Sequence, residues 1–356
     1  MTSTQLSCAF ATTHDSPEHI RIAEDLGYAR AWLYDTPQQS PDVWLMLALA
    51  AQKTSRIGLG PGVLVPSLRH PMVNAAQTRT LQEMAPGRLA VAFGTGFTGR
   101  VAMGSRPLPW KYVAAYVRAY RSLLQGETIE WDGARMRMLP TDSDHFEPYQ
   151  LPPIVLGTTG PVGARWAEEL DVDGILAFGY PTETMKNYPW AAFLTVGTVL
   201  DDGEDPSCER VKLAAGPGCS VTYHLAHALG GPDAVKTIPG GPEFLDVIEQ
   251  TAEPDQHLAV HSGHLMRMNP ADHAAWNAGG HVLFDRLLTT GTAGQVAQAV
   301  QQLSDLGVTE VIYQPAGPDI PRELERFRDA TAATLTGPTT AMKGQHPVGH
   351  MDPAIG

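Results

Sequence analysis

Three glycine-rich segments carry many of the polar groups in this chain that could bind a ligand. Each follows a short apolar run, and they are Gly60–Val63, Gly94–Gly96 and Gly157–Gly160. Such turns present backbone N–H groups, and Thr95, Thr158 and Thr159 add hydroxyls. These groups suit the polar edge of a ring or a phosphate, although βα turns also need glycine for their backbone alone. The three segments are therefore the first candidates for a ligand site.

Three titratable residues are candidates for chemistry. Asp35 ends an expected strand in AWLYDTPQQ, where a carboxylate could bind a cofactor by orienting a ring-edge N–H, could orient a substrate group, or could only cap the loop before Pro37. His261 and His264, in HSGHLMRM, could contact substrate or transfer a proton, because histidine titrates near neutral pH. A plain loop role is the competing interpretation. A metal site would need further ligands, and the neighbouring sequence offers none at a recognisable spacing, so we predict no metal.

The elements that must position these residues alternate between strands and helices. The apolar runs Ile57–Val65 and Leu89–Phe93 read as strands, and Pro71–Met84 between them reads as a helix. Two strands joined by a crossover helix form a βαβ unit, which requires a parallel sheet. Because ligands bind at the carboxyl ends of parallel strands, the glycine-rich turns lie where an active site is expected.

The same alternation extends along most of the chain. Eight strands are expected, beginning near Leu6, Ala29, Ile57, Leu89, Ile154, Gly174, Phe193 and Val308. Eight such units predict one closed (β/α)8 TIM barrel, spanning residues 1–336, rather than an open sheet. Two insertions interrupt it. The first, about 127–149, contains a hairpin around Asp132-Gly133, and the second, about 214–286, reads as helices and loops before the last strand. Residues 337–356 read as a weakly ordered tail.

Composition restricts the class of protein. The net charge of −13 over 356 residues disfavours nucleic acid and anionic membranes as partners. No apolar run approaches the roughly 18 residues that span a bilayer, and the first residues lack the pattern of a secretory leader. The three cysteines are Cys8, Cys208 and Cys219. Their odd number and spacing predict no disulfide framework and a reducing compartment, the cytoplasm.

Five segments in order resemble one known superfamily. They are RIGLGPGVLVPSLRHP (56–71), APGRLAVAFGTG (85–96), LLQGETIEWDG (123–133), PIVLGTTGPVGARWAEELDVDGIL (153–176) and GTAGQVAQAVQQLSDLGVTEVIYQPAG (291–317). The chain resembles the bacterial luciferase-like flavin and deazaflavin oxidoreductases, and within them the branch of methylenetetrahydromethanopterin reductase and related enzymes that use coenzyme F420. The resemblance implies a (β/α)8 barrel that binds a reduced flavin or deazaflavin at its C-terminal face.

The resemblance also implies roles for individual residues. A cis peptide bond is expected between Gly62 and Val63, where it would back the cofactor ring. Thr95 and Gly96 would contact the cofactor, and so would the turn that follows the fifth strand, which contains Gly157, Thr158, Thr159 and Gly160.

Two further positions carry over less directly. Arg286, in FDRLLTTGT, matches a basic position that relatives direct at the cofactor phosphate, or else it is a surface arginine. Asp35 is followed by Thr36, where F420-dependent relatives often have histidine. This departure leaves the proton donor open, and His264 is the catalytic candidate beside Asp35.

Three functions are compatible with these patterns. The first is F420H2-dependent hydride transfer to a small-molecule acceptor. The second is a monooxygenase that uses O2 and FMNH2, with a separate reductase as partner. The third is a barrel that binds a flavin or another ligand without catalysis. In the enzymatic cases we expect a homodimer acting on a small molecule, with F420 as cofactor or FMN as the alternative.

Overall fold

The computed structural model describes residues 4–139, 150–179, 181, 183–286 and 289–335. Within these ranges the side chains of residues 97–98, 183–184 and 284–286 are not described. The expected tail at 337–356 lies outside the described residues. Among the described residues, no helix has the length and apolar character that crossing a membrane requires.

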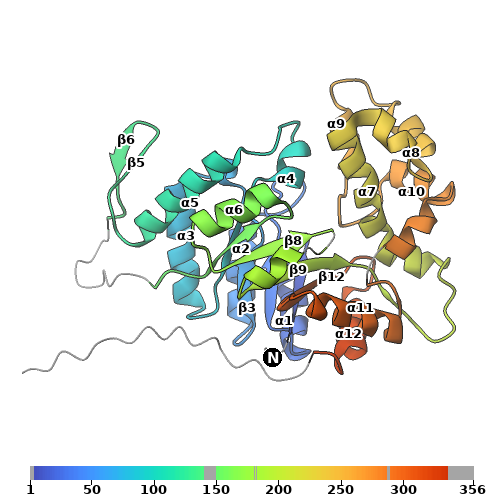
Figure 1. Cartoon of the computed structure of the whole chain (residues 1–356), viewed down its shortest axis with the longest axis horizontal. Coiled ribbons are helices and arrows are strands. Elements are labelled where there is room, and N and C mark those ends of the chain that lie inside the picture. The colour runs from blue at the N-terminus through green and yellow to red at the C-terminus, as the bar shows by residue number, and fades with distance from the viewer. Residues whose placement is uncertain (1–3, 140–149, 180, 182, 287–288, 336–356) are drawn as a thin grey trace, which may run out of the picture.

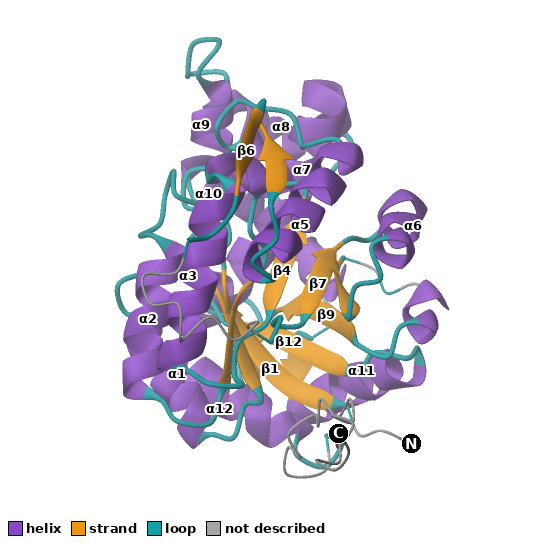
Figure 2. Cartoon of the chain, turned by 90° about the vertical axis from the view of Figure 1, so that its left-hand side faces the viewer, coloured by secondary structure: helices purple, strands orange, loops and turns teal. Residues whose placement is uncertain are grey.

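Eight parallel strands form the wall of a barrel, in the order β3-β2-β1-β12-β9-β8-β7-β4 (Figure 2). Their bounds are β1 Gln5–Phe10, β2 Arg30–Leu33, β3 Gly58–Pro61, β4 Val91–Gly94, β7 Ile154–Gly157, β8 Gly174–Phe178, β9 Ala191–Val196 and β12 Glu310–Gln314. Backbone hydrogen bonds also join the two end strands, because Ala90 N donates to Leu59 O over 3.0 Å and Leu64 N to Ala92 O over 2.7 Å. The predicted (β/α)8 barrel is confirmed.

Helices pack around this wall (Figure 1). They are α1 Ser16–Asp25, α2 Val43–Lys53, α3 Pro71–Met84, the short α4 Phe97–Val101, α5 Trp110–Leu124, α6 Pro161–Glu169, α11 Ala293–Asp305 and α12 Ile320–Thr331. Local signals explain several helix starts. Asp42 accepts hydrogen bonds from the backbone N–H groups of Trp44 and Leu45, and proline stands in the first turn of α1, α3, α6 and α12.

Short elements complete the fold. They are the 3-10 turns η1 Pro66–Leu68 and η3 Glu183–Asn187, the strand pair β10 Val199–Leu200 and β11 Gly291–Thr292, and the hairpin β5 Ile129–Trp131 and β6 Ala134–Met136. The hairpin turns at Asp132 and Gly133, whose φ angles of 51° and 75° are those of the turn that an Asp-Gly pair favours. It stands away from the barrel in Figure 1.

The N-terminal end of the barrel interior is filled by aromatic side chains. The indole N–H groups of Trp32 and Trp190 both donate to the carboxylate of Glu310, and all three residues are buried. The Arg30 guanidinium lies over both indoles, 5.4 and 5.2 Å from the ring centres. Small interior residues such as Ala9 surround the pair. The same interior cluster has a more open side, where Tyr34, Val63 and Leu194 are only partly buried.

The second insertion forms a helical lobe beside the barrel (Figure 1). It contains α7 Glu209–Lys236, α8 Gly241–Ile248, α9 Gln256–Val260, α10 Pro270–Asn277 and the 3-10 segment η4 Gly280–Arg286. The helix α7 begins before the expected boundary at Ala214, and its backbone kinks at Gly231. Phe244, Leu245 and Trp276 belong to a hydrophobic cluster of the lobe that is separate from the barrel clusters.

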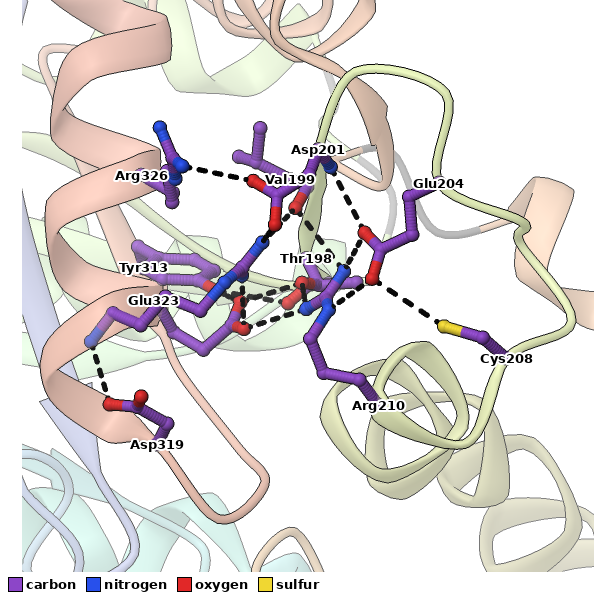
Figure 3. A network of polar contacts seen from close by, with 12 residues as sticks. Thr198, Val199, Asp201, Glu204, Cys208, Arg210, Tyr313, Asp319, Glu323 and Arg326 are labelled. Atoms are coloured by element: carbon purple, nitrogen blue, oxygen red, sulfur yellow. Dashed lines mark hydrogen bonds and ion pairs between the residues drawn. The ribbon is translucent and has the colours of Figure 1, made fainter.

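A buried ionic network attaches the start of α7 to α12 and the barrel wall (Figure 3). Arg210 in α7 binds Glu323 in α12 over 2.9 Å and Glu204 in the preceding loop. Thr198 donates to Glu323 over 2.6 Å, and Arg322 binds the same carboxylate. Hydrogen bonds from Arg210 hold the pKa of Glu204 down at about 2. The lobe is thus anchored at its first turn by charged groups rather than by a shared apolar core.

Candidate functional site

The predicted ligand turns all open on one end of the barrel. Asp35 is the second residue after β2, Gly62 directly follows β3, Thr95 follows β4, and Gly157 ends β7. All four strands are parallel, so these residues lie at the carboxyl ends, as expected from the sequence. The bond between Gly62 and Val63 is cis, as expected too.

The Val63 side chain forms a partly exposed apolar ledge across this end. It packs on the backbone of two glycines, and a Cβ added to Gly94 would lie 2.8 Å from Val63 Cγ2. A Cβ added to Gly157 would lie 2.7 Å from Cγ1. Beneath the ledge, a Cβ on Gly62 would lie 2.9 Å from the Trp32 ring. Only glycine therefore leaves room for Val63 in this position, and a planar ring could rest on the ledge.

Polar groups border the ledge on two sides. Thr95 and Thr158 are partly exposed, and Thr159 and Gly160 are exposed at the start of α6. The first turn of a helix has N–H groups without intrahelical acceptors, which favours anions there. Gly96 is buried with φ 74°, and a Cβ on it would lie within van der Waals overlap of the Val65 side chain. Gly96 therefore shapes the turn, while the threonines and the α6 start present donors.

Asp35 is buried and is bound by Arg69. Its side chain is 1% exposed, and Arg69 Nη1 donates to its two oxygens over 2.8 and 2.7 Å. Val65 N donates to it over 3.4 Å, and Arg69 also binds Asp42 over 2.7 Å. Burial raises the pKa of Asp35, although the Arg69 charge opposes this. The carboxylate is thus placed to hold the segment that carries Val63.

A cavity of about 800 Å³ lies between the loops at the carboxyl ends of β1, β2 and β12 and the helical lobe. Its wall includes Phe10 from β1, Gln39 from the loop after β2, and His261 and Leu265 from the lobe. Gln314, at the end of β12, donates to Leu265 O over 2.8 Å and accepts from the Tyr34 hydroxyl over 2.6 Å. Since Tyr34 packs in the interior group that contains Val63, Gln314 connects the ledge to the cavity wall.

His264 is buried in the lobe and is not part of the cavity wall. Its Nδ1 lies 2.6 Å from His224 Nδ1, and its backbone oxygen accepts from Gln39 over 3.3 Å. Burial and the neighbouring His224 lower the pKa of His264 well below the usual value. His264 is therefore a neutral imidazole at pH 7. The other histidine of the pair, His261, is the one that reaches the cavity.

The structure also shows residues of the site that the sequence patterns did not reveal. Arg69 binds Asp35, and its signal was a basic residue between a strand end and the proline that starts α3. Gln314 is the last residue of the apolar strand β12, and its signal was a polar side chain at a strand end, as for Asp35. Thr36 is buried, and its hydroxyl lies 3.0 Å from that of Ser40. The side chain of Arg286 lies outside the described part, so its predicted phosphate contact stays a prediction.

The fold and this site together define a barrel enzyme whose ligands bind at the C-terminal face. The chain belongs to the luciferase-like monooxygenase family, whose model matches residues 2–189. This confirms the family that the sequence resembles. It also places the chain among the flavin and deazaflavin oxidoreductases.

Named relatives and a solved structure agree with the family. The chain is 25% identical over 325 residues to the 5,10-methylenetetrahydromethanopterin reductase of Archaeoglobus fulgidus, which covers 86% of this chain and 91% of the relative. It is 29% identical over 313 residues to the F420-dependent glucose-6-phosphate dehydrogenase of Microbacterium testaceum, covering 84% and 86%. The coenzyme F420 dependent tetrahydromethanopterin reductase of Methanopyrus kandleri has the same fold, with a TM-score of 0.64, 18% identity and coverage of 94% and 100%.

Proposed function

We propose that this protein transfers a hydride from reduced coenzyme F420 to a small-molecule acceptor. The observation that carries the proposal is the ledge of Val63 on Gly94 and Gly157, which can support one face of a planar ring. Relatives named as F420-dependent glucose-6-phosphate dehydrogenases support the deazaflavin over other ring cofactors. F420 would supply the hydride from its ring, and the protein would supply orientation and a dry site.

The residues around the ledge have distinct tasks in this proposal. Val63 supports the ring, and Thr95 and Thr158 orient its polar edge or the phosphate through their hydroxyls. Asp35 acts as a positioning residue, because its contacts with Arg69 and with Val65 N fix the segment that bears Val63. The cavity bounded by Gln39, His261 and Leu265 would hold the acceptor. The predicted catalytic role of His264 becomes a positioning role, since its ring contacts His224 and not the cavity.

Binding and turnover test this proposal together. The purified chain is titrated with F420 and, separately, with FMN, and quenching of the cofactor fluorescence gives each dissociation constant. Reduced F420 is then mixed with a panel of carbonyl, imine and activated alkene acceptors in an anaerobic cuvette. We expect tighter binding of F420 than of FMN, and reoxidation of F420H2 by at least one acceptor class without O2. Binding of FMN alone would contradict the proposal.

A monooxygenase that uses FMNH2 is the second candidate. The family model that matches the chain is described by this activity. A monooxygenase would need O2 for every turnover, would place one oxygen atom in its product, and would depend on a partner reductase that supplies FMNH2. Strict dependence on O2 with FMNH2, together with inactivity of F420H2, would therefore favour this candidate.

The compartment and the assembly state are further parts of the proposal. Cys8, Cys208 and Cys219 are free thiols in the structure, which fits the reducing cytoplasm that we predict from the sequence. A homodimer remains the predicted assembly, and light scattering measures it directly.

A further inference from the structure

Three buried histidines of the lobe meet at one point. His224 comes from α7, His261 ends α9, and His264 lies in the loop after it. One ring nitrogen of each lies within 4.8 Å of those of the other two. These three residues are from 1% to 5% exposed. The cluster is far from Val63 and its glycines in the chain, and the proposed function does not use it for chemistry.

A carboxylate fixes the orientation of one imidazole in this cluster. Asp272 in α10 is 1% exposed, and its Oδ1 lies 3.0 Å from His224 Nε2. Its Oδ2 accepts from Asn269 N over 2.9 Å, in the capping box that starts α10. The carboxylate therefore requires the proton of His224 on Nε2, which leaves a lone pair on Nδ1. Histidines that bind metals commonly donate their second ring N–H to a carboxylate in this way.

The third imidazole has a nitrogen without a partner. His261 Nδ1 is buried, and no hydrogen bond reaches it from the described residues. Buried polar atoms are normally hydrogen-bonded, so this atom is an exception that calls for a ligand.

We propose that His224, His261 and His264 bind one divalent transition-metal ion, with Zn²⁺ as the preferred occupant. Imidazole nitrogen suits zinc, and three histidines leave one position of a tetrahedral ion for water or a ligand. His261 also lines the cavity, so the ion lies beside it. This inference goes beyond the proposed function and does not depend on it. The sequence analysis predicted no metal because His224 stands 40 residues before His264.

Modest movement brings the three nitrogens to bonding distance. Zn–N bonds of about 2.0–2.1 Å at tetrahedral angles separate the ligand nitrogens by roughly 3.4 Å. The nitrogens of His224 and His264 are 2.6 Å apart and must separate by somewhat less than about 1 Å. The ion would then replace the proton that these two nitrogens share. The His261 nitrogen lies within 4.8 Å of the others and must approach by at most about 1.4 Å.

Zinc binding to the metal-free chain tests the site. The full chain, without an affinity tag and stripped with a chelator, is titrated with Zn²⁺ alone in a calorimeter. We expect one ion per chain with a dissociation constant in the micromolar range or below. His261→Phe keeps an aromatic ring and removes a nitrogen that makes no hydrogen bond, so it should weaken Zn²⁺ binding at least 100-fold. Its unfolding temperature in metal-free buffer should match that of the wild type.

A matched control and a spectrum complete the test. His281→Phe changes an exposed histidine of the same lobe and should leave Zn²⁺ binding unchanged. Co²⁺ on the wild type should give the intense visible bands of a four-coordinate ion, and Zn²⁺ should abolish them. Failure of the wild type to bind Zn²⁺, equal binding by His261→Phe, equal losses in the two variants, or a six-coordinate Co²⁺ spectrum would each overturn the inference.

Discussion

Replacing Gly157 by alanine should displace the ledge with little cost to the fold. The new Cβ would lie 2.7 Å from Val63 Cγ1, and its next neighbour, Phe93 O, is at an ordinary 3.6 Å. The contact is therefore with one methyl group, and Val63 can move because it is only partly buried. Overpacking a side chain costs about 1 kcal/mol at the lower end of its range. Alanine also lowers the conformational entropy of the unfolded chain relative to glycine, which offsets about 0.5–1 kcal/mol of that cost. Stability should thus change by no more than about 1 kcal/mol.

Cofactor binding should respond more strongly than stability. The Val63 methyl group that moves away from the added Cβ enters the space above the ledge, where the ring would rest. We expect the F420 dissociation constant to rise at least about 10-fold, which corresponds to about 1.4 kcal/mol. Val63→Ala removes the clash together with the ledge, so in the Val63→Ala background the added change Gly157→Ala should weaken F420 binding much less than it does in the wild-type background. Fluorescence titration measures binding, and urea denaturation measures stability.

The double variant decides whether this reasoning holds. If Gly157→Ala weakens F420 binding equally in the wild-type background and in the Val63→Ala background, the effect does not pass through the ledge. If stability falls by as much as binding, Gly157 is needed for packing and not for the cofactor.

Three other changes test separate parts of the molecule. Gly294 is an exposed position of helix α11, and an added Cβ there meets nothing within 4 Å. Gly294→Ala should therefore raise the free energy of unfolding by about 0.5–1 kcal/mol and leave F420 binding unchanged in the same two assays. Asp35→Asn keeps the shape of the side chain and removes its charge. Because burial raises the pKa of Asp35, the contact with Arg69 only offsets the cost of burying the charge, so urea denaturation should show a change within about 1 kcal/mol; a loss of about 3 kcal/mol or more would contradict this. Because the pKa of Glu204 is lowered in the fold, its ionised carboxylate stabilises the folded protein fully above about pH 4.5, and this stabilisation is lost as the pH falls towards 2. Glu204→Gln should therefore be less stable than the wild type at pH 6, and the difference should shrink on acidification. Thermal unfolding at several pH values measures this.

Local signals predicted the elements of the barrel well. The helix expected at Pro71–Met84 has those bounds in the structure, because proline and apolar periodicity are read from adjacent residues. The predicted hairpin turn falls at Asp132 and Gly133 for the same reason.

The contacts of the site were harder to predict because they join distant parts of the chain. Asp35 and Arg69 are 34 residues apart, and nothing near Asp35 announces its partner. The position of Asp35 near a strand end was predicted correctly. The direction of its side chain depends on the backbone conformation of the chain after Leu33, which the sequence pattern does not give. His224 lies within the long helix α7, and its partner His264 is 40 residues away in the chain, so only the packing of the lobe reveals the cluster.

The closed floor of the barrel has a consequence for the order of events during turnover. Trp32 and Trp190, held by Glu310, fill the N-terminal end of the interior. Every molecule that occupies the interior must therefore enter and depart through the opposite opening. An acceptor held over a ring on Val63 would, under the proposed function, stand between that ring and the opening, so its product would have to depart before the ring could. Under the proposed function, steady-state kinetics should follow an ordered sequential scheme in which the cofactor binds first and dissociates last.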